Sequence, residues 1–312
     1  MIRLSLPFFC LRRGPQDRGE ILLYHTRRLF VKRKFAQIFF CKTPEICAYF
    51  SQIFLAFPLA IPYNNTCKEQ GTHNSKGEQK IMDRRIKYLM GLDTETCNGI
   101  VLDGDKLDLS QSLVYDIGWA ITDKRGNIYK TRSFLIYEVF VAMKDVMASA
   151  YYAEKIPMYW EQVKSGQRKL VRFQTMYNMF WNDLKEYGVS AIFAHNARFD
   201  WKALTNTIRW VYKSKKRYFF PYKMEIWDTL KMARQTIGKQ KSYRRFCERN
   251  GYMTNHRVPQ VRLTAEILFR YISGINDFDE SHTGLEDVLI ETKIMAHCFK
   301  QHKPMEYRLF AS

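Results

Sequence analysis

Hydrophobic and polar positions follow the period of β-strands, and then of helices, from about residue 88 onward. The apolar run 88–96 (YLMGLDTET) predicts a first strand. Residues 112–123 and 129–140 predict the two strands of a hairpin, because a turn-forming DKRGN sequence separates them. These segments indicate that the domain begins with a small antiparallel sheet.

Helical patterns then alternate with shorter apolar runs. Helices are predicted at 141–155, 172–187, 263–272 and 285–300, and short strands at 191–196 and 223–227. A hairpin-joined sheet whose later strands are separated by helices is typical of an α/β domain built as three layers, with the sheet in the middle.

Two acidic residues stand at the end of the first strand. Residues i and i+2 of a strand point to the same side, so Asp93 and Glu95 share one face. Carboxylates held together repel each other, and burying them unpaired is costly. A divalent cation relieves both costs, and Mg²⁺ or Mn²⁺ prefers oxygen ligands of this kind. An isolated DxE is more often a strand end with solvated acids, so the assignment depends on the rest of the chain.

Two further motifs follow in the chain. The stretch 191–200 (AIFAHNARFD) predicts a strand, a turn and a helix that opens near Asp200, and 282–287 (HTGLED) precedes a second helical pattern. With DxE, NxxFD and HxxxxD in this order and at these separations, the chain resembles the DnaQ-like 3′–5′ exonucleases of the His-containing (DEDDh) branch. The resemblance covers roughly residues 86–300.

The resemblance implies a ribonuclease H-like fold with a five-stranded mixed sheet flanked by helices. It also implies that Asp93, Glu95, Asp200 and Asp287 are the acidic ligands of a site for two Mg²⁺ or Mn²⁺ ions. His282 would then be the general base that takes a proton from the attacking water. Hydrolysis of a phosphodiester needs such an activated water, charge neutralisation and support for the leaving oxygen, which two metals supply together.

The spacing selects the branch of the family. The other branch has Tyr four residues before the last Asp, where this chain has Thr283, whereas His occupies the position five before it. The family's usual Ala two residues after the His is Gly284 here. Glycine costs some order at a helix start but removes no chemical group, so we expect the change to be tolerated.

Substrate contacts are expected from residues beside the motifs: Thr94, Thr96, Asn196 and Phe199. Asn196 would hold the Asp200 loop and Phe199 would pack against a terminal base. A turn residue and a core aromatic are equally good interpretations of these last two.

Other polar residues near the motifs receive structural interpretations. We expect Asp228 and His195 to support the fold and Cys97 to be a small packing residue. Glu286 is expected to be a solvated helix residue. Glu291, one turn beyond Asp287, is expected to lie on the exposed surface, with a position behind the metal ligands as the alternative.

The chain is strongly basic, with 50 Lys+Arg, 31 Asp+Glu and a net charge of +19, which favours a polyanionic partner such as nucleic acid. Cations and rings that could meet the phosphates and bases of a single strand cluster after the second motif. A basic helical face over an aromatic core is the alternative for this set: Tyr212, Lys213, Lys215, Lys216, Arg217, Tyr218, Phe219, Phe220, Tyr222, Lys239, Lys241, Tyr243, Arg244, Arg245, Phe246 and Arg249.

Three functions remain open on the sequence alone. The favoured one is a metal-dependent 3′–5′ exonuclease that acts on single-stranded DNA or RNA. A catalytically inactive nucleic-acid-binding module of the same fold is the alternative, although the expected catalytic residues are all present. An endonuclease or strand-transfer enzyme would share the carboxylates but does not predict the spacing of His282.

Residues 1–81 have a different composition, with clumped aromatics that show no sustained period. Lys76-Gly77-Glu78 can be encoded by a purine-rich sequence of the bacterial ribosome-binding kind, three codons before Met82. We therefore expect 1–81 to be a non-native upstream extension or a disordered segment, and 82–312 to be the exonuclease domain. With 37 Lys+Arg and 26 Asp+Glu, residues 82–312 keep a net charge of +11.

The cysteines fit no zinc or disulfide spacing, so reduced thiols and a cytoplasmic location are expected. Charged residues and prolines interrupt the apolar stretches of 1–81, so no membrane partner is predicted. The oligomeric state is left open, with a homodimer among the alternatives.

Overall fold

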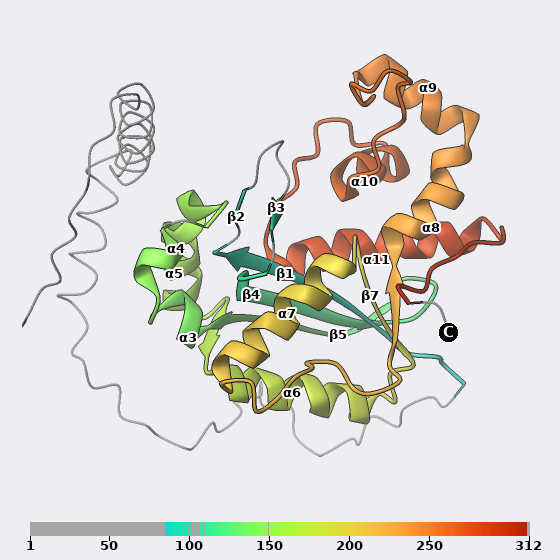
Figure 1. Ribbon diagram of the computed structural model, residues 1–312. Coiled ribbons are helices and arrows are strands. Elements are labelled where there is room, and N and C mark those ends of the chain that lie inside the picture. Colours follow the sequence, from blue (N-terminus) through green and yellow to red (C-terminus); the bar gives the residue numbers. More distant parts are fainter. Residues whose placement is uncertain (1–84, 99, 102–106, 109, 149, 311–312) are drawn as a thin grey trace, which may run out of the picture. The chain divides into compact units, whose positions relative to one another are not determined.

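A mixed β-sheet forms the centre of the protein. The computed structural model describes residues 85–98, 100–101, 107–108, 110–148 and 150–310, so the expectation for 1–81 lies outside the described residues. The main sheet has six strands in the order β6-β5-β4-β1-β7-β8 (Figure 1). Their bounds are β1 Leu89–Cys97, β4 Leu113–Thr122, β5 Ile128–Ile136, β6 Lys169–Val171, β7 Ala191–Ala194 and β8 Glu225–Asp228; a separate small pair joins β2 Ile100–Val101 to β3 Leu107–Asp108.

The strand directions define the class of fold. β4 runs antiparallel to both of its neighbours, β1 and β5, whereas β7 and β8 run parallel to β1. The order β5-β4-β1-β7-β8 with only the second strand reversed is the ribonuclease H-like arrangement, so the α/β fold expected from the sequence is confirmed. The sheet has six strands instead of five because β6 adds to the outer edge of β5.

The helices differ from expectation mainly between the hairpin and α6. The predicted strand 129–140 ends at Ile136, and the predicted helix 141–155 is replaced by two short pieces, α4 and η1. The bounds are α3 Tyr137–Phe140, α4 Lys144–Met147, η1 Ala153–Lys155, α5 Ile156–Lys164, α6 Phe173–Glu186, α7 Arg198–Val211, α8 Thr229–Gln235, η2 Ile237–Lys239, α9 Lys241–Asn250, α10 Ala265–Ser273 and α11 Gly284–Lys300.

Helices cover both faces of the sheet. α11 packs on β1 and β4, with α8 and α10 beside it, while α6 and α7 lie on the opposite face (Figure 1). Neighbouring residues of β4 show this division: Gly118 meets the start of α11, whereas the indole of Trp119 donates a hydrogen bond of 2.9 Å to Asp183 of α6. Because both faces are covered, every residue of β4 is buried.

The start of α11 lies directly against β4. A Cβ added at Gly118 would lie 2.2 Å from the backbone nitrogen of Leu285, and one at Gly284 would lie 2.7 Å from the nitrogen of Gly118. Gly118 pairs with Asp93 across the sheet, so this contact brings α11 to the acidic end of β1. Glycine at position 284 is therefore required by the packing, because the methyl group of an alanine would overlap the backbone of β4.

No helix among the described residues combines the length and the apolar composition needed to cross a membrane. The cysteines in this part of the chain, Cys97, Cys247 and Cys298, are buried free thiols. Cys97 packs in the core, as expected.

Gly118→Ala should lower the free energy of unfolding by about 3 kcal/mol, the upper end of the cost of overpacking, because the methyl group meets backbone of α11. Gly166→Ala is the control, since its Cβ would meet nothing within 4 Å and only the left-handed backbone (φ +78°) is penalised, by about 1 kcal/mol. Urea denaturation of both variants measures the difference. Equal losses would contradict the close contact.

Candidate active site

Strand β1 presents alternate side chains to the two layers of helices. Asp93 and Glu95 lie on the side of α11, and their carboxylate oxygens and those of Asp287 lie within 4.8 Å of one another. Thr94 lies between them in sequence and is buried; its hydroxyl donates a hydrogen bond of 2.8 Å to Asp200 on α7. The strand therefore gathers acids from both layers at one end of the sheet.

Asp200 and Asp287 each come from the first turn of a helix. Asp200 is in the first turn of α7, and Asp287 is in the first turn of α11; they are 2% and 5% exposed. The amino end of a helix carries partial positive charge, which stabilises a carboxylate there. Two helix starts thus aim acids at the same end of β1.

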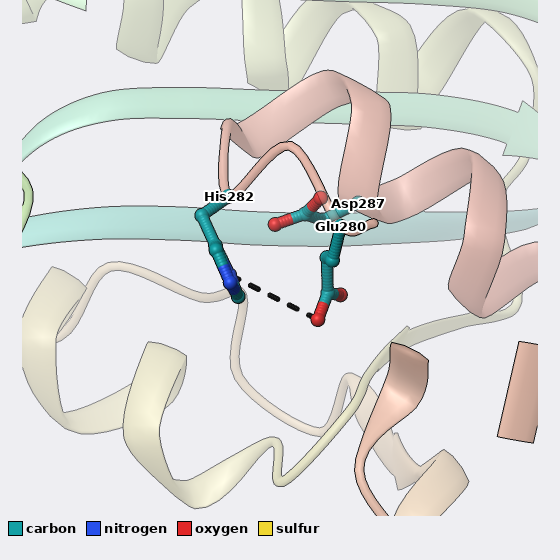
Figure 2. Close-up of side chains that lie close together, drawn as sticks. All are labelled: Glu280, His282 and Asp287. Atoms are coloured by element: carbon teal, nitrogen blue, oxygen red, sulfur yellow. Dashed lines mark ion pairs between the residues drawn. The ribbon is translucent and has the colours of Figure 1, made fainter. Parts of the chain in front are cut away.

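A glutamate that sequence reasoning missed lies in the same place. Figure 2 shows Glu280 beside His282 and Asp287, on the segment that leads into α11. Oxygen or ring-nitrogen atoms of these three side chains lie within 4.8 Å of one another. No motif singles out Glu280, because it stands in a polar stretch without periodicity.

The raised pKa values of these acids indicate that they are not all ionised near pH 7 when no cation is bound. Burial, followed by the charges of Asp200 and Glu291, raises the pKa of Asp93 well above its ordinary value. Burial and then Asp116 raise the pKa of Glu95 to about 9, and burial and then Glu280 raise that of Asp287 to about 8. Burial also raises the pKa of Asp200 to about 7, although hydrogen bonds from Thr94 oppose the rise.

This donor set fits divalent cations. The oxygens are hard ligands and lie close together. Lys155 opposes the rise in the pKa values of Glu95 and Asp287 but does not cancel it. One oxygen of the buried Glu291, Oε2, also has no hydrogen-bond partner among the described residues. The residues present are thus those that would hold Mg²⁺ or Mn²⁺.

His282 lies at the edge of this cluster. Its ring stacks on Tyr152, with the ring centres 4.6 Å apart, and its Nδ1 lies 3.8 Å from Oε2 of Glu280. Desolvation, and then the charge of Lys155, lowers the pKa of His282. The imidazole is therefore neutral near pH 7 and able to accept a proton.

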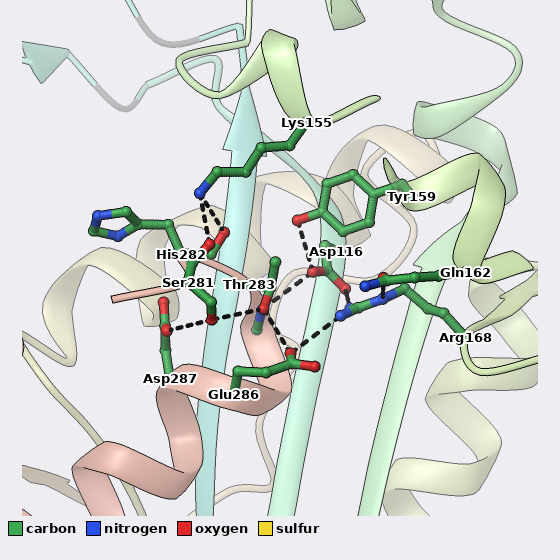
Figure 3. Close-up of polar contacts among 11 residues, drawn as sticks. Asp116, Lys155, Tyr159, Gln162, Arg168, Ser281, His282, Thr283, Glu286 and Asp287 are labelled. Atoms are coloured by element: carbon green, nitrogen blue, oxygen red, sulfur yellow. Dashed lines mark hydrogen bonds and ion pairs between the residues drawn. The ribbon is translucent and has the colours of Figure 1, made fainter. Parts of the chain in front are cut away.

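Lys155 fixes the backbone beside this histidine. Its Nζ donates a hydrogen bond of 2.6 Å to the carbonyl oxygen of Ser281 and one of 3.5 Å to that of His282 (Figure 3). His282 has a left-handed backbone (φ 48°), which is unfavourable for a residue with a side chain. These contacts help to hold that conformation, and nothing local in the sequence around Lys155 predicts them.

A buried ion pair holds the first turn of α11. Asp116 is fully buried and accepts hydrogen bonds from Arg168 Nη1 (2.5 Å), Tyr159 (3.0 Å) and the backbone N–H of Gly284 (3.1 Å) (Figure 3). Arg168 also donates to Glu286 at 3.1 Å. Asp116 pairs with Glu95 across the sheet, so the network lies next to the acidic cluster without joining it.

Residues near the second motif have the following places. The backbone N–H of Asn196 donates to Asp228, which also caps α8 by accepting from Leu230. His195 is structural, because its ring nitrogens contact Thr229 Oγ1 (3.0 Å) and the carbonyl of Leu263 (2.8 Å).

The four residues expected to contact a substrate lie in different environments. Asn196 and Phe199 line the cleft described below, and Thr96 is partly buried at the end of β1. Thr94 also borders the cleft, but its hydroxyl is engaged by Asp200 on the α7 side of the sheet. Their contacts with a substrate stay a prediction.

Two glutamates of α11 differ from expectation. Glu291 was expected on the surface, but it is only 3% exposed, and its Oε1 accepts a hydrogen bond of 2.9 Å from the backbone N–H of His195. Glu286, expected to be solvated, is partly exposed and bonded to Arg168 and Thr283.

The aromatic residues after the second motif divide between core and surface. Phe219 and Tyr243 are completely buried, which is the core alternative, whereas Tyr218 and Tyr222 are exposed.

An open cleft of about 700 Å³ is lined by Asp93, Glu95, Glu280, Asp287 and Glu291. Another part of its wall comes from α8 and from the segment before α10, where Met253 and Val261 form an isolated bridge. Arg234 and Arg262 on that wall add cations to a cleft whose floor is acidic. Such a cleft can hold a phosphate between a divalent cation and arginines.

No protein-family model matches the chain, and no curated protein matches its sequence. Solved structures that are similar include the following three. The nuclease domain of 3′hExo, a DEDDh family member bound to rAMP, is 12% identical over 73% of this chain and 100% of its own, with a TM-score of 0.47. A full-length 3′-exonuclease is 12% identical over 75% of this chain and 68% of its own, with a TM-score of 0.42. Exonuclease X in complex with 5′ overhanging duplex DNA is 17% identical over 68% of this chain and 91% of its own, with a TM-score of 0.32.

The strand order gives this chain the ribonuclease H-like fold of the DnaQ-like exonucleases. The resemblance expected from the three motifs is thereby confirmed at the level of the fold.

Without divalent cations the protein should lose stability as the pH rises from about 6 to about 9. The folded-state pKa values of Asp200, Asp287 and Glu95, about 7, 8 and 9, lie above those of an unfolded chain, near 4. The folded state then binds more protons in this window, and their loss destabilises it. Thermal melting in EDTA should show a falling Tm, and Mn²⁺ should restore it at pH 8. A Tm in EDTA that does not change with pH would contradict the repulsion among the carboxylates.

Proposed function

We propose that the protein is a metal-dependent 3′–5′ exonuclease that hydrolyses phosphodiester bonds at the 3′ end of single-stranded DNA or RNA. The observation that carries the proposal is the convergence of Asp93, Glu95 and Asp287 in one cleft with His282, while Asp200 is joined to the same strand by its hydrogen bond from Thr94. The motif order supplies the reaction class, and the raised pKa values support the need for cations.

Each residue has a defined task in this proposal. The carboxylates of Asp93, Glu95, Asp200 and Asp287 hold two divalent cations, Mg²⁺ or Mn²⁺. These cations, when bound, supply charge neutralisation at the phosphate and lower the pKa of water. Neutral His282 takes the proton of the attacking water, whose oxygen bonds to phosphorus while the bond to the 3′-oxygen breaks. The products are a nucleoside 5′-monophosphate and a chain shortened by one unit.

The cleft offers contacts for a single strand. Arg234 and Arg262 supply positive charge to the cleft that the acids line, and Phe199 supplies a ring beside the second motif. Phosphates meet cations and bases stack on rings in this mode of binding. The net charge of +19 favours encounter with any polyanion, in a salt-dependent way.

Purified full-length protein should shorten 5′-labelled single-stranded DNA or RNA stepwise with Mg²⁺ or Mn²⁺, and EDTA should abolish the reaction. Asp200→Asn keeps the size of the side chain but removes a ligand. It should therefore slow cleavage by more than the roughly 10–100-fold that loss of an outer partner of a metal site costs. Gel electrophoresis of the products checks both. A ladder that appears only with 3′-labelled substrate would indicate the opposite polarity, and binding without cleavage would favour an inactive module.

His282→Ala should lower kcat by about 10²–10⁴-fold, the usual contribution of a general base, and leave Mn²⁺ affinity nearly unchanged. Single-turnover cleavage and a Mn²⁺ titration measure the two effects separately. Equal loss of turnover and of metal affinity would show that His282 is a ligand and would contradict its assignment as the base.

A further inference from the structure

Glu291 is a buried carboxylate with one oxygen unused. It lies one turn beyond Asp287 on α11, a spacing that places both side chains on the same face of the helix. Oε1 accepts a hydrogen bond of 2.9 Å from the backbone N–H of His195, at the end of β7. Oε2 is buried and has no hydrogen-bond partner among the residues that the structure describes.

An unpaired buried carboxylate oxygen is expensive, and a fold does not retain it without compensation. Glu291 is only 3% exposed, yet it borders the same cleft as Asp93, Glu95 and Asp287. The side chains whose charges act on it most strongly are acids, with Asp200 first and Asp287 next. Its neighbours therefore repel a negative charge, and no side chain in the described part of the chain donates to Oε2.

We propose that Glu291 is a fifth carboxylate of the metal site and contributes its free oxygen Oε2 to the coordination sphere of a divalent cation held by Asp93 and Asp200. This inference rests on the proposed function, because it takes a cation to bind at the motif acids. It adds a residue that lies outside the three motifs.

The two oxygens of Glu291 then have different partners. Oε1 fixes the end of β7, where the chain turns into the loop that leads to Asp200, and Oε2 faces the cation. The His195 contact orients the carboxylate so that one oxygen is held toward the acids. The residue thereby connects α11 with the loop between β7 and α7.

The test is a titration of full-length protein with Mn²⁺, followed by the electron paramagnetic resonance of the free ion at pH 7.5. Glu291→Gln keeps a carbonyl oxygen that accepts from the His195 N–H, but it replaces Oε2 by an amide NH2 group, which is no ligand for a cation, and it removes the negative charge. We expect this variant to bind Mn²⁺ at least about tenfold more weakly, because a ligand is lost and the loss of a mere outer partner of a metal already costs roughly 10–100-fold. Glu286→Gln removes a charge from the same helix, but from a carboxylate already bonded to Arg168 and Thr283, and should change the affinity less than twofold.

Melting of the same variants separates coordination from folding. In EDTA, Glu291→Gln should melt at or above the wild-type temperature, because a repelled buried charge is gone. The increase in Tm that Mn²⁺ gives should be smaller than in the wild type. Unchanged Mn²⁺ affinity in Glu291→Gln, or an equal loss in Glu286→Gln, would overturn the inference alone. A wild-type protein that binds no Mn²⁺ would instead overturn the proposed function.

Discussion

Electrostatic repulsion among carboxylates at one end of the sheet is the constraint on which the rest of the site depends. Asp93 and Glu95 reach this place from β1, Asp200 from α7, and Asp287 and Glu291 from α11. Burial raises their pKa values because water cannot stabilise the charges, and each carboxylate raises those of its neighbours. A fold that holds such a group together must include something that offsets the repulsion. Helix amino ends and the Thr94 hydroxyl offset part of it, and divalent cations are suited to offset the remainder.

The scaffold keeps the acids together by fixing where α11 begins. Gly118 and Gly284 let the backbone of the helix approach β4, and Asp116 accepts a hydrogen bond from the Gly284 N–H. Arg168 pairs with Asp116 and so holds this further acid in place beside Glu95, although the charge of Asp116 still adds to the repulsion that raises the pKa of Glu95. Lys155 then holds the carbonyl groups on either side of the turn that carries His282. The precise start of one helix thus sets the position of His282 relative to the acidic side chains.

The sequence predicted the parts of this arrangement that follow from short periods and fixed spacings. The period of a strand places Asp93 and Glu95 on one face. The motif at 191–200 predicts the turn before α7, and the motif at 282–287 predicts the start of α11. Lys155 and Ser281 are 126 positions apart, and no local pattern connects them. Glu291 was misjudged because helical spacing from Asp287 fixes its face but not whether that face is covered. β6 was missed because three partly exposed residues carry no usable alternation.

Thr94 connects strand β1 with the helical layer that contains α7. It separates two acids that point toward α11, while its own hydroxyl binds the acid of α7 on the other side of the sheet. Any ion bound by Asp93, Asp200 and Glu291 would therefore join both helical layers through a single strand. The free energy of binding that ion would also be free energy that keeps the two layers closed on the sheet. The bonds between the ion and the carboxylates would then both hold this end of the domain together and take part in its chemistry.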